Sequence, residues 1–202
     1  MNETWAWISG WAIAPERFKA AVEQALPEAH HLVFAPTADA VQQVLKSKAT
    51  HVAGYSLGSL LLLNAVDRFP TKTKLYCLAP FLAFCKEAEL GGNTPEASLI
   101  AIQKRLEQTP EKALKLFYRL SGITATVPET LPYSLPDLIW GLEALRTLQA
   151  NESAAQQAIA LIGTKDALIE HHVGCNDWSK SYLVDASHCY IELLHYFVRP
   201  IM

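Results

Sequence analysis

The sequence lacks the features that mark a nucleic-acid-binding, secreted or membrane-spanning protein. Its 17 Lys and Arg are outnumbered by 20 Asp and Glu, which gives a formal net charge of −3 and no general attraction to nucleic acid or anionic membranes. Its longest apolar stretches, such as Leu60–Leu63, are far too short to cross a bilayer. No basic segment stands before the first apolar run, which argues against a secretory signal peptide. We therefore expect a cytoplasmic protein that binds neither nucleic acid nor membrane.

Cysteine is also scarce. The four cysteines form no CxxC pair, and no His/Cys spacing is typical of a zinc site, so we expect no metal; they are Cys77, Cys85, Cys175 and Cys189. We interpret them as small apolar residues of a reduced protein.

Charged residues of both signs are few, at 18% of the chain, whereas half of its 202 residues are hydrophobic. This balance excludes a disordered chain and provides enough apolar material for one sizeable core. The length is that of a single domain, which we expect to span residues 1–202.

Short apolar runs alternate with helical patterns over the first part of the chain. We predict strands at Trp5–Ser9, His31–Phe34, His51–Gly54 and Leu75–Ala79. Between them we predict helices at Pro15–Leu26, around Val41–Leu45 and at Leu57–Phe69. This alternation is typical of a parallel sheet that is covered by helices on both faces.

The alternation stops at about residues 91–150, where we find no clear strand. Apolar residues recur there at helical spacing in three pieces: Leu99, Ile102 and Leu106; Leu114, Phe117 and Leu120; Leu138, Leu142 and Leu145. Two further strands are predicted beyond this segment, at Ala158–Ile162 and Ser181–Val184, and a final helix at about His188–Val198. The sequence thus predicts a parallel sheet interrupted once by a helical insertion.

One turn of the predicted sheet carries a nucleophile pattern. Gly54-Tyr55-Ser56-Leu57-Gly58 follows a strand and opens a helix. In a nucleophile elbow the serine occupies such a turn, in a strained backbone conformation at the carboxyl edge of the sheet, and the flanking glycines avoid collisions with the neighbouring strand and helix. The helix that begins there favours negative charge beside the serine. The pentapeptide alone is common, but its strand–turn–helix context makes Ser56 the candidate nucleophile.

A serine hydroxyl is a weak nucleophile unless a base takes its proton. His188, in Ala186-Ser187-His188, follows the last predicted strand, and Asp166, in Gly163-Thr164-Lys165-Asp166, follows the strand before it. The order Ser56, Asp166, His188 places each residue just past the carboxyl end of a strand, where they can meet as nucleophile, acid and base.

Other readings of these residues stay open. Taken alone, His188 could cap the last helix and Asp166 could be a turn residue. The competing acids are Asp177 and Asp185, of which Asp185 stands too close to His188 in the sequence to reach its ring easily. The other histidines follow Asp166 too closely, lie within the last helix, or flank strands and are expected to be structural; they are His171, His172, His195, His30, His31 and His51.

An oxyanion hole needs two backbone N–H groups close to the developing charge. One is expected from Leu57, the residue after the nucleophile, and the other from the loop after the first strand, Ser9-Gly10-Trp11. Gly10 allows a close backbone approach, and Trp11 N–H is the second candidate donor. The Trp11 ring is also a candidate wall of the acyl pocket.

Together these motifs resemble the α/β-hydrolase superfamily, and within it the carboxylesterases that cleave pimeloyl-acyl-carrier-protein methyl ester in biotin synthesis. The segment Gly141–Thr147 is similar to the cap of that group. Many relatives carry His-Gly where this chain has Ser9-Gly10, although some smaller ones carry Ser-Gly-Trp. Because the sequence begins directly at the first predicted strand, we expect the usual hairpin before that strand to be absent. The resemblance therefore implies a compact α/β-hydrolase fold with a mostly parallel sheet of about six strands and a helical cap at about 91–150.

The resemblance also implies a function. An ester would acylate Ser56, and water activated by His188 would release the acid, with no cofactor required. The expected substrate is the pimeloyl-acyl-carrier-protein methyl ester. A general short-acyl esterase or thioesterase of the same fold, and a hydrolase-fold protein that only binds ligands, are the alternatives.

The helical insertion is expected to choose the substrate. The candidate acyl pocket, where ordinary core packing is the alternative reading, comprises Phe81, Phe84, Phe117 and Trp140. Lys112, Lys115 and Arg119 recur on one helical face, near Lys104 and Arg105. A solvated face is the usual explanation, and a docking surface for acidic acyl carrier protein is the alternative. We expect a monomer.

Overall fold

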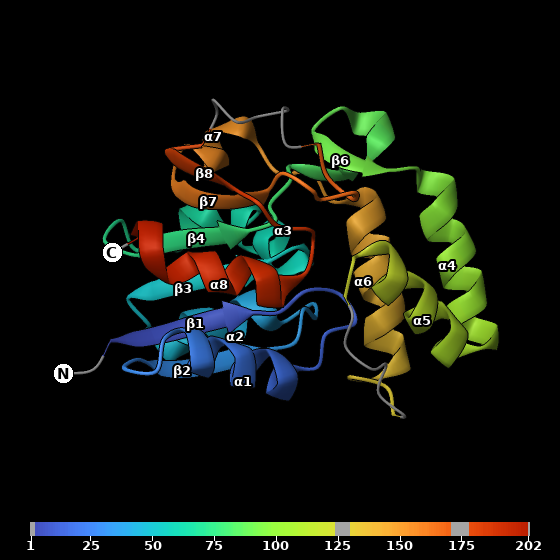
Figure 1. The fold of residues 1–202 in the computed structure, drawn as a ribbon, viewed down its shortest axis with the longest axis horizontal. Coiled ribbons are helices and arrows are strands. Elements are labelled where there is room, and N and C mark those ends of the chain that lie inside the picture. The colour runs from blue at the N-terminus through green and yellow to red at the C-terminus, as the bar shows by residue number, and fades with distance from the viewer. Residues whose placement is uncertain (1–2, 124–129, 171–177, 202) are drawn as a thin grey trace.

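The computed structural model describes residues 3–123, 130–170 and 178–201, and a parallel sheet lies at its centre (Figure 1). Its six strands are arranged in the order β2-β1-β3-β4-β7-β8, and every neighbouring pair is parallel. They are β1 (Thr4–Ile8), β2 (His30–Phe34), β3 (His51–Tyr55), β4 (Lys74–Leu78), β7 (Ala158–Gly163) and β8 (Lys180–Val184). The predicted parallel sheet of about six strands is confirmed.

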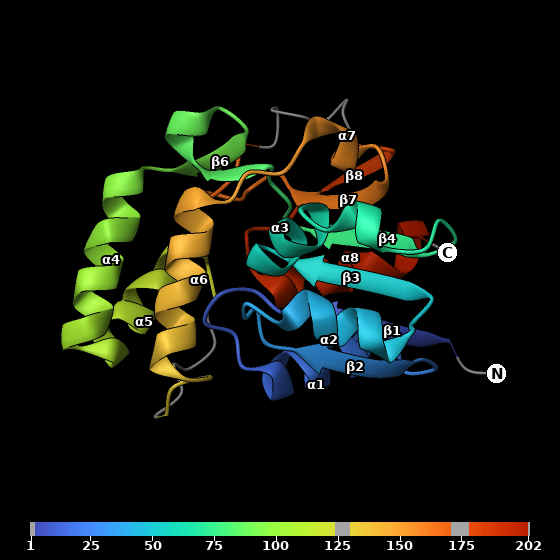
Figure 2. The ribbon, with the colours of Figure 1, turned by 180° about the vertical axis from the view of Figure 1, so that it is seen from behind.

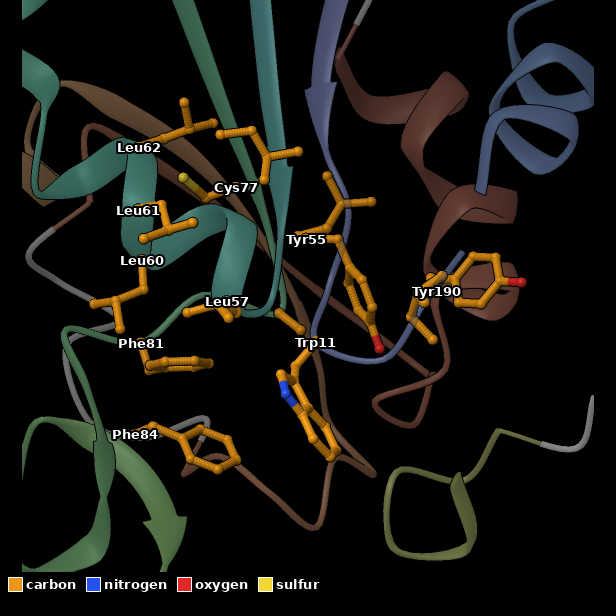
Figure 3. Packing of buried hydrophobic residues seen from close by; sticks show 14 of the residues in the cluster. Trp11, Tyr55, Leu57, Leu60, Leu61, Leu62, Cys77, Phe81, Phe84 and Tyr190 are labelled. Atoms are coloured by element: carbon orange, nitrogen blue, oxygen red, sulfur yellow. The ribbon is translucent and has the colours of Figure 1, made fainter. Parts of the chain in front are cut away.

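Helices cover both faces of this sheet, as predicted. Helices α1 (Pro15–Ala25) and α8 (Tyr190–Ile201) lie in front of it in Figure 1, and α2 (Ala40–Ser47) and α3 (Leu57–Leu63) lie in front of it in Figure 2. All five residues of β3 and all seven of α3 are buried, because a strand with both faces covered contacts apolar side chains on each side. Figure 3 shows the leucines of α3 packed beside Cys77 of β4.

Three helices form a cap beyond the carboxyl ends of the strands (Figures 1 and 2). They are α4 (Glu96–Gln108), α5 (Pro110–Leu120) and α6 (Leu135–Thr147). The apolar residues predicted at helical spacing are buried here, apart from Leu120, which is 44% exposed at the end of α5. Across the described ranges, no helix is long and apolar enough to span a membrane.

The prediction of no strand within 91–150 was wrong. Strand β6 (Gly91–Thr94) pairs in parallel with β5 (Ala83–Cys85) in a small second sheet, and a short 3-10 turn, Lys86–Ala88, lies between them. Only glycine permits the close approach of β6 to β5 at this point: a Cβ atom on Gly92 would lie 2.0 Å from the Phe84 carbonyl oxygen. A Gly-Gly-Asn-Thr strand has no apolar alternation, so periodicity could not predict it.

Two smaller differences also concern helices. The helix predicted to reach Phe69 ends at Leu63. The next residue, Asn64, donates both its backbone N–H and its side-chain N–H to the Leu60 carbonyl, each at 3.0 Å. A 3-10 turn, Val66–Arg68, follows. The single turn of α7 (Glu152–Ala155) was not predicted.

The buried thiol of Cys77 predicts how stability depends on pH. Burial raises the pKa of Cys77 from 9.0 to about 12. The folded chain therefore keeps this proton at pH values where the unfolded chain has released it. Its contribution to stability is complete below pH 9 and decreases by about 1.4 kcal/mol per pH unit as the pH rises toward 12.

Urea unfolding between about pH 8 and about pH 11 checks this expectation. We expect Cys77→Ala to flatten the alkaline fall in unfolding free energy relative to wild type. An equally steep fall in the variant would contradict the assignment to Cys77.

Candidate active site

Ser56 occupies a strained turn between β3 and α3. Its φ of 53° and ψ of −115° lie in a region that residues other than glycine rarely adopt, and its N–H donates to the Leu78 carbonyl at 2.9 Å. A Cβ atom on Gly58 would lie 2.2 Å from the Ile8 carbonyl oxygen, so only glycine lets α3 begin this close to β1. The turn therefore lifts the Ser56 side chain to the carboxyl edge of the sheet, which faces the cap.

Ser56, His188 and Asp166 form one hydrogen-bonded chain. Ser56 Oγ lies 2.9 Å from His188 Nε2, and His188 Nδ1 lies 2.6 Å from Asp166 Oδ2. A carboxylate can only accept, so Nδ1–H donates to Asp166 and leaves Nε2 to accept the Ser56 proton. The second carboxylate oxygen accepts the Leu168 N–H at 2.9 Å, which fixes the plane of the carboxyl group. The three residues come from the segments that follow β3, β7 and β8.

Protein atoms surround this chain closely. The side chains of His188 and Asp166 are 1% and 0% exposed. Tyr55 Oη donates to the His188 carbonyl at 2.6 Å and holds the histidine loop against β3. Burial, and then the Asp166 carboxylate, raise the pKa of Tyr55 well above its ordinary value, so its hydroxyl keeps the proton that it donates. On the other side of the loop, Ser187 donates its N–H and Oγ–H to Glu192 at 2.7 and 2.9 Å.

The alternative acid Asp185 does not contact His188. It is exposed and forms an ion pair with Lys165, whose Nζ lies 2.8 Å from its carboxylate. The other alternative, Asp177, lies outside the described residues, as do His171, His172 and Cys175.

The remaining histidines lie away from Ser56. His31 is buried and accepts a hydrogen bond from Trp7 Nε1 at 3.0 Å, and His51 stacks on Trp5 with ring centroids 4.6 Å apart. His30 and His195 are exposed on the surface. The two buried rings lie on β2 and β3, and each contacts a tryptophan of β1.

The two predicted oxyanion donors lie on either side of the serine turn. Leu57 is the first residue of α3, and Trp11 lies in the loop after β1. A Cβ atom on Gly10 would lie 2.5 Å from the Tyr55 ring and 3.4 Å from Ser56 Cβ, so the loop is in close contact with the turn. Within the described part of the chain, neither Leu57 N–H nor Trp11 N–H donates to a backbone carbonyl. Their role as oxyanion donors stays a prediction.

Aromatic residues of the cap, of the β4–β5 connection and of β5 gather near this loop. The Phe117 ring meets the Trp11 ring edge-on, with centroids 4.6 Å apart, and Phe81 packs on Phe84 at 4.9 Å. Figure 3 shows Trp11, Phe81 and Phe84 beside Leu57. Trp140 is half-buried on α6 against the same core. These residues were predicted as an acyl pocket, and that role stays a prediction.

The basic residues of the cap lie on its surface. Lys112, Lys115 and Arg119 are exposed on α5, which packs against α4, where Lys104 and Arg105 are exposed. None of the ion pairs between described residues includes any of these five side chains. The same part of the chain contains no group of three His, Cys, Asp or Glu side chains placed to hold a metal ion.

Comparisons with known proteins identify the fold. No protein-family model matches the sequence, and no curated protein matches it. An esterase from Exiguobacterium antarcticum is similar in structure, with a TM-score of 0.71 and 16% identity over 98% of this chain and 92% of its own. BioG from Haemophilus influenzae has a TM-score of 0.67 and 15% identity over 98% and 92%. The bottromycin epimerase BotH, solved with bottromycin A2, has a TM-score of 0.66 and 17% identity over 98% and 87%.

The chain therefore has the α/β-hydrolase fold, as the sequence motifs predicted. The likeness extends over nearly the whole length of these proteins. At such low identity it establishes the fold alone, and an epimerase among the similar structures shows that the fold does not decide the reaction. The reaction has to be argued from the site.

Proposed function

We propose that this protein is a serine carboxylesterase. The observation that carries the proposal is the buried chain from Ser56 Oγ through the His188 ring to the Asp166 carboxylate, at 2.9 and 2.6 Å. It supplies a nucleophile, a base and an orienting acid in the geometry that acyl transfer requires. Esterases and hydrolases among the similar structures support the same class of reaction.

In the proposed reaction Ser56 Oγ attacks the ester carbonyl carbon while its proton passes to His188 Nε2. The oxyanion that forms is stabilised by the N–H groups of Leu57 and Trp11. Collapse of this intermediate breaks the bond to the alcohol, which leaves with the proton from His188. Water then gives a proton to His188 and attacks the acyl-enzyme, and the acid is released as Ser56 regains its hydrogen. Asp166 holds the imidazole and stabilises its charged form throughout.

The substrate proposed is the methyl ester of pimeloyl-acyl-carrier protein. The sequence motifs support this proposal: the Ser9-Gly10-Trp11 loop and the Gly141–Thr147 segment resemble those of the carboxylesterases that cleave this ester. We expect the enzyme to act as a monomer in the cytoplasm.

Two assays test this function in order. Purified protein is first offered short acyl esters and thioesters, where hydrolysis of esters supports the class and a preference for thioesters would replace it with a thioesterase. A biotin-auxotrophic strain that lacks its pimeloyl-ester esterase is then complemented with wild type or Ser56→Ala. Failure of wild type to rescue growth, with ester hydrolysis intact, would reject the pimeloyl substrate alone.

A carrier-bound substrate predicts a role for the basic face of α5. Acyl carrier protein is acidic, and the cations of Lys112, Lys115 and Arg119 are exposed. We expect their combined replacement by Glu to raise KM for the carrier-bound ester by about 10-fold or more, because like charges then meet at the contact. Hydrolysis of a small methyl ester should be unchanged.

The matched control reverses three exposed lysines near the amino ends of the strands, away from the cap: Lys46, Lys72 and Lys74. This variant has the same formal net charge as the α5 variant but keeps the α5 surface intact. Equal KM values for the carrier-bound ester in both triple variants would contradict docking on α5.

A further inference from the structure

The loop that carries Trp11 contains a strained turn. Ile13 N–H donates to the Gly10 carbonyl at 3.1 Å and closes a four-residue turn, in which Ala12 is the third residue. Ala12 has a φ of 63°, and a positive φ at this position is the mark of a type II turn, which normally requires glycine. A buried alanine in this conformation persists only where its surroundings hold it.

The groups that hold Ala12 come from the cap. Tyr118 Oη, on α5, donates to the Ala12 carbonyl at 2.8 Å. Ala12 N–H in turn donates to Tyr133 Oη, just before α6, also at 2.8 Å. Both backbone polar groups of Ala12 are therefore satisfied by cap side chains that stand more than a hundred residues away, at separations of 106 and 121.

Both hydroxyls keep their protons at physiological pH. Burial raises the pKa of Tyr118 to about 12 and that of Tyr133 still further. Tyr118 can therefore act as a donor and Tyr133 as a neutral acceptor over the whole range in which an esterase works.

The neighbouring Trp11 is attached to the cap as well. Its indole N–H donates to the Leu138 carbonyl of α6 at 2.8 Å, and its ring meets Phe117 of α5. Helix α6 approaches the indole closely at Gly141, where a Cβ atom would lie 2.6 Å from Trp11 Cδ1. The cap thus contacts both central residues of the turn, Trp11 and Ala12.

We propose that Tyr118 and Tyr133 are positioning residues that hold the Gly10–Ile13 turn so that Trp11 N–H faces the oxyanion at Ser56. The proposal rests on the serine esterase function proposed above. It means that the oxyanion hole is complete only while the cap is docked on this turn. Ser56 is only 3% exposed under the docked cap, so a substrate can reach it only when the cap moves. Substrate entry and assembly of the oxyanion hole therefore both depend on the contacts between the cap and the Gly10–Ile13 turn.

Conservative variants of the two tyrosines test this role. Tyr118→Phe and Tyr133→Phe each remove one hydroxyl and keep the ring. We expect each to lower kcat by about 10-fold or more with KM changed by less than about threefold, because the loss falls on the transition state. The double variant should lose little more than the worse single variant, since both hydroxyls hold one residue.

Two further proteins separate positioning from general packing. Tyr76→Phe removes the hydroxyl of a buried tyrosine in the central sheet, outside the cap, and should keep wild-type kcat. Gly141→Ala leaves both tyrosines intact but displaces α6 from Trp11, and should lower kcat as the tyrosine variants do.

Amide hydrogen exchange of the Gly10–Ile13 turn gives a readout that needs no substrate. Faster exchange at the Ala12 and Ile13 amides in both Phe variants, with unchanged exchange in the central strands, supports the positioning role of the two tyrosines. Unchanged exchange in both variants would overturn the positioning role, whether or not the wild type hydrolyses esters. A wild type that hydrolyses no ester would, by itself, reject only the proposed esterase function. In an active enzyme, unchanged kcat, or a raised KM with unchanged kcat, would overturn the positioning role.

Discussion

Replacing Ser56 by alanine is expected to lower kcat for ester hydrolysis by at least about 10⁴-fold. The alanine has no oxygen to attack the ester, and no other hydroxyl is hydrogen-bonded to His188 Nε2 among the described residues. The fold should be retained, because the His188 ring is the only hydrogen-bond partner of Ser56 Oγ among the described residues. Steady-state kinetics and a urea unfolding curve check the two halves of this expectation.

Ser59→Ala is the matched control for this loss. Ser59 is also buried on α3, but its Oγ donates to the Gly54 and Leu78 carbonyls at 2.8 and 3.1 Å. Its removal should cost on the order of 1 kcal/mol of stability and leave kcat within a small factor of wild type. If Ser56→Ala kept about a tenth of wild-type turnover, Ser56 would not be the nucleophile.

Asp166→Asn is expected to lower kcat by about 10³- to 10⁴-fold with KM little changed. Oδ1 of Asp166 accepts the Leu168 N–H, so the asparagine carbonyl should take that place and turn its NH₂ toward His188 Nδ1. The ring nitrogen must then accept this hydrogen bond, which moves the imidazole hydrogen to Nε2. A protonated Nε2 cannot take the Ser56 proton, although the geometry of the site is kept.

Asp185→Asn separates this effect from a general loss of negative charge. Asp185 is exposed and paired with Lys165, and an exposed pair contributes little to stability. We expect this variant to match wild type in kcat and KM. The assignment of Asp166 as the acid would be contradicted if the two Asn variants lost activity equally, or if only Asp185→Asn did.

The sequence alone predicts that Ser56, Asp166 and His188 lie close together. Each follows an apolar run that is typical of a parallel strand, and the carboxyl ends of parallel strands meet at one edge of a sheet. Chain order and strand spacing therefore predict proximity without any distance. The same logic predicted that Gly10 brings the loop after β1 close to the serine turn.

The features that sequence could not predict are side-chain contacts between distant segments. Tyr118 lies in an amphipathic helix and Tyr133 near a proline-containing loop, and neither has a spacing that indicates a partner at Ala12. The β5–β6 pair depends on the close approach allowed by Gly92, which is a property of the packed structure. Leu120 fits the apolar period of α5 but stands at its end, where the helix leaves the core.

The central claim is that Ser56 is a nucleophile activated by His188, and covalent labelling tests it most directly. Wild type, Ser56→Ala and Ser59→Ala are treated with a fluorophosphonate, and intact mass and peptide mapping locate the adduct. The proposed mechanism predicts one phosphonyl group per chain on Ser56 in wild type and Ser59→Ala, and none in Ser56→Ala. An unlabelled wild type, or an adduct that persists in Ser56→Ala, would contradict it.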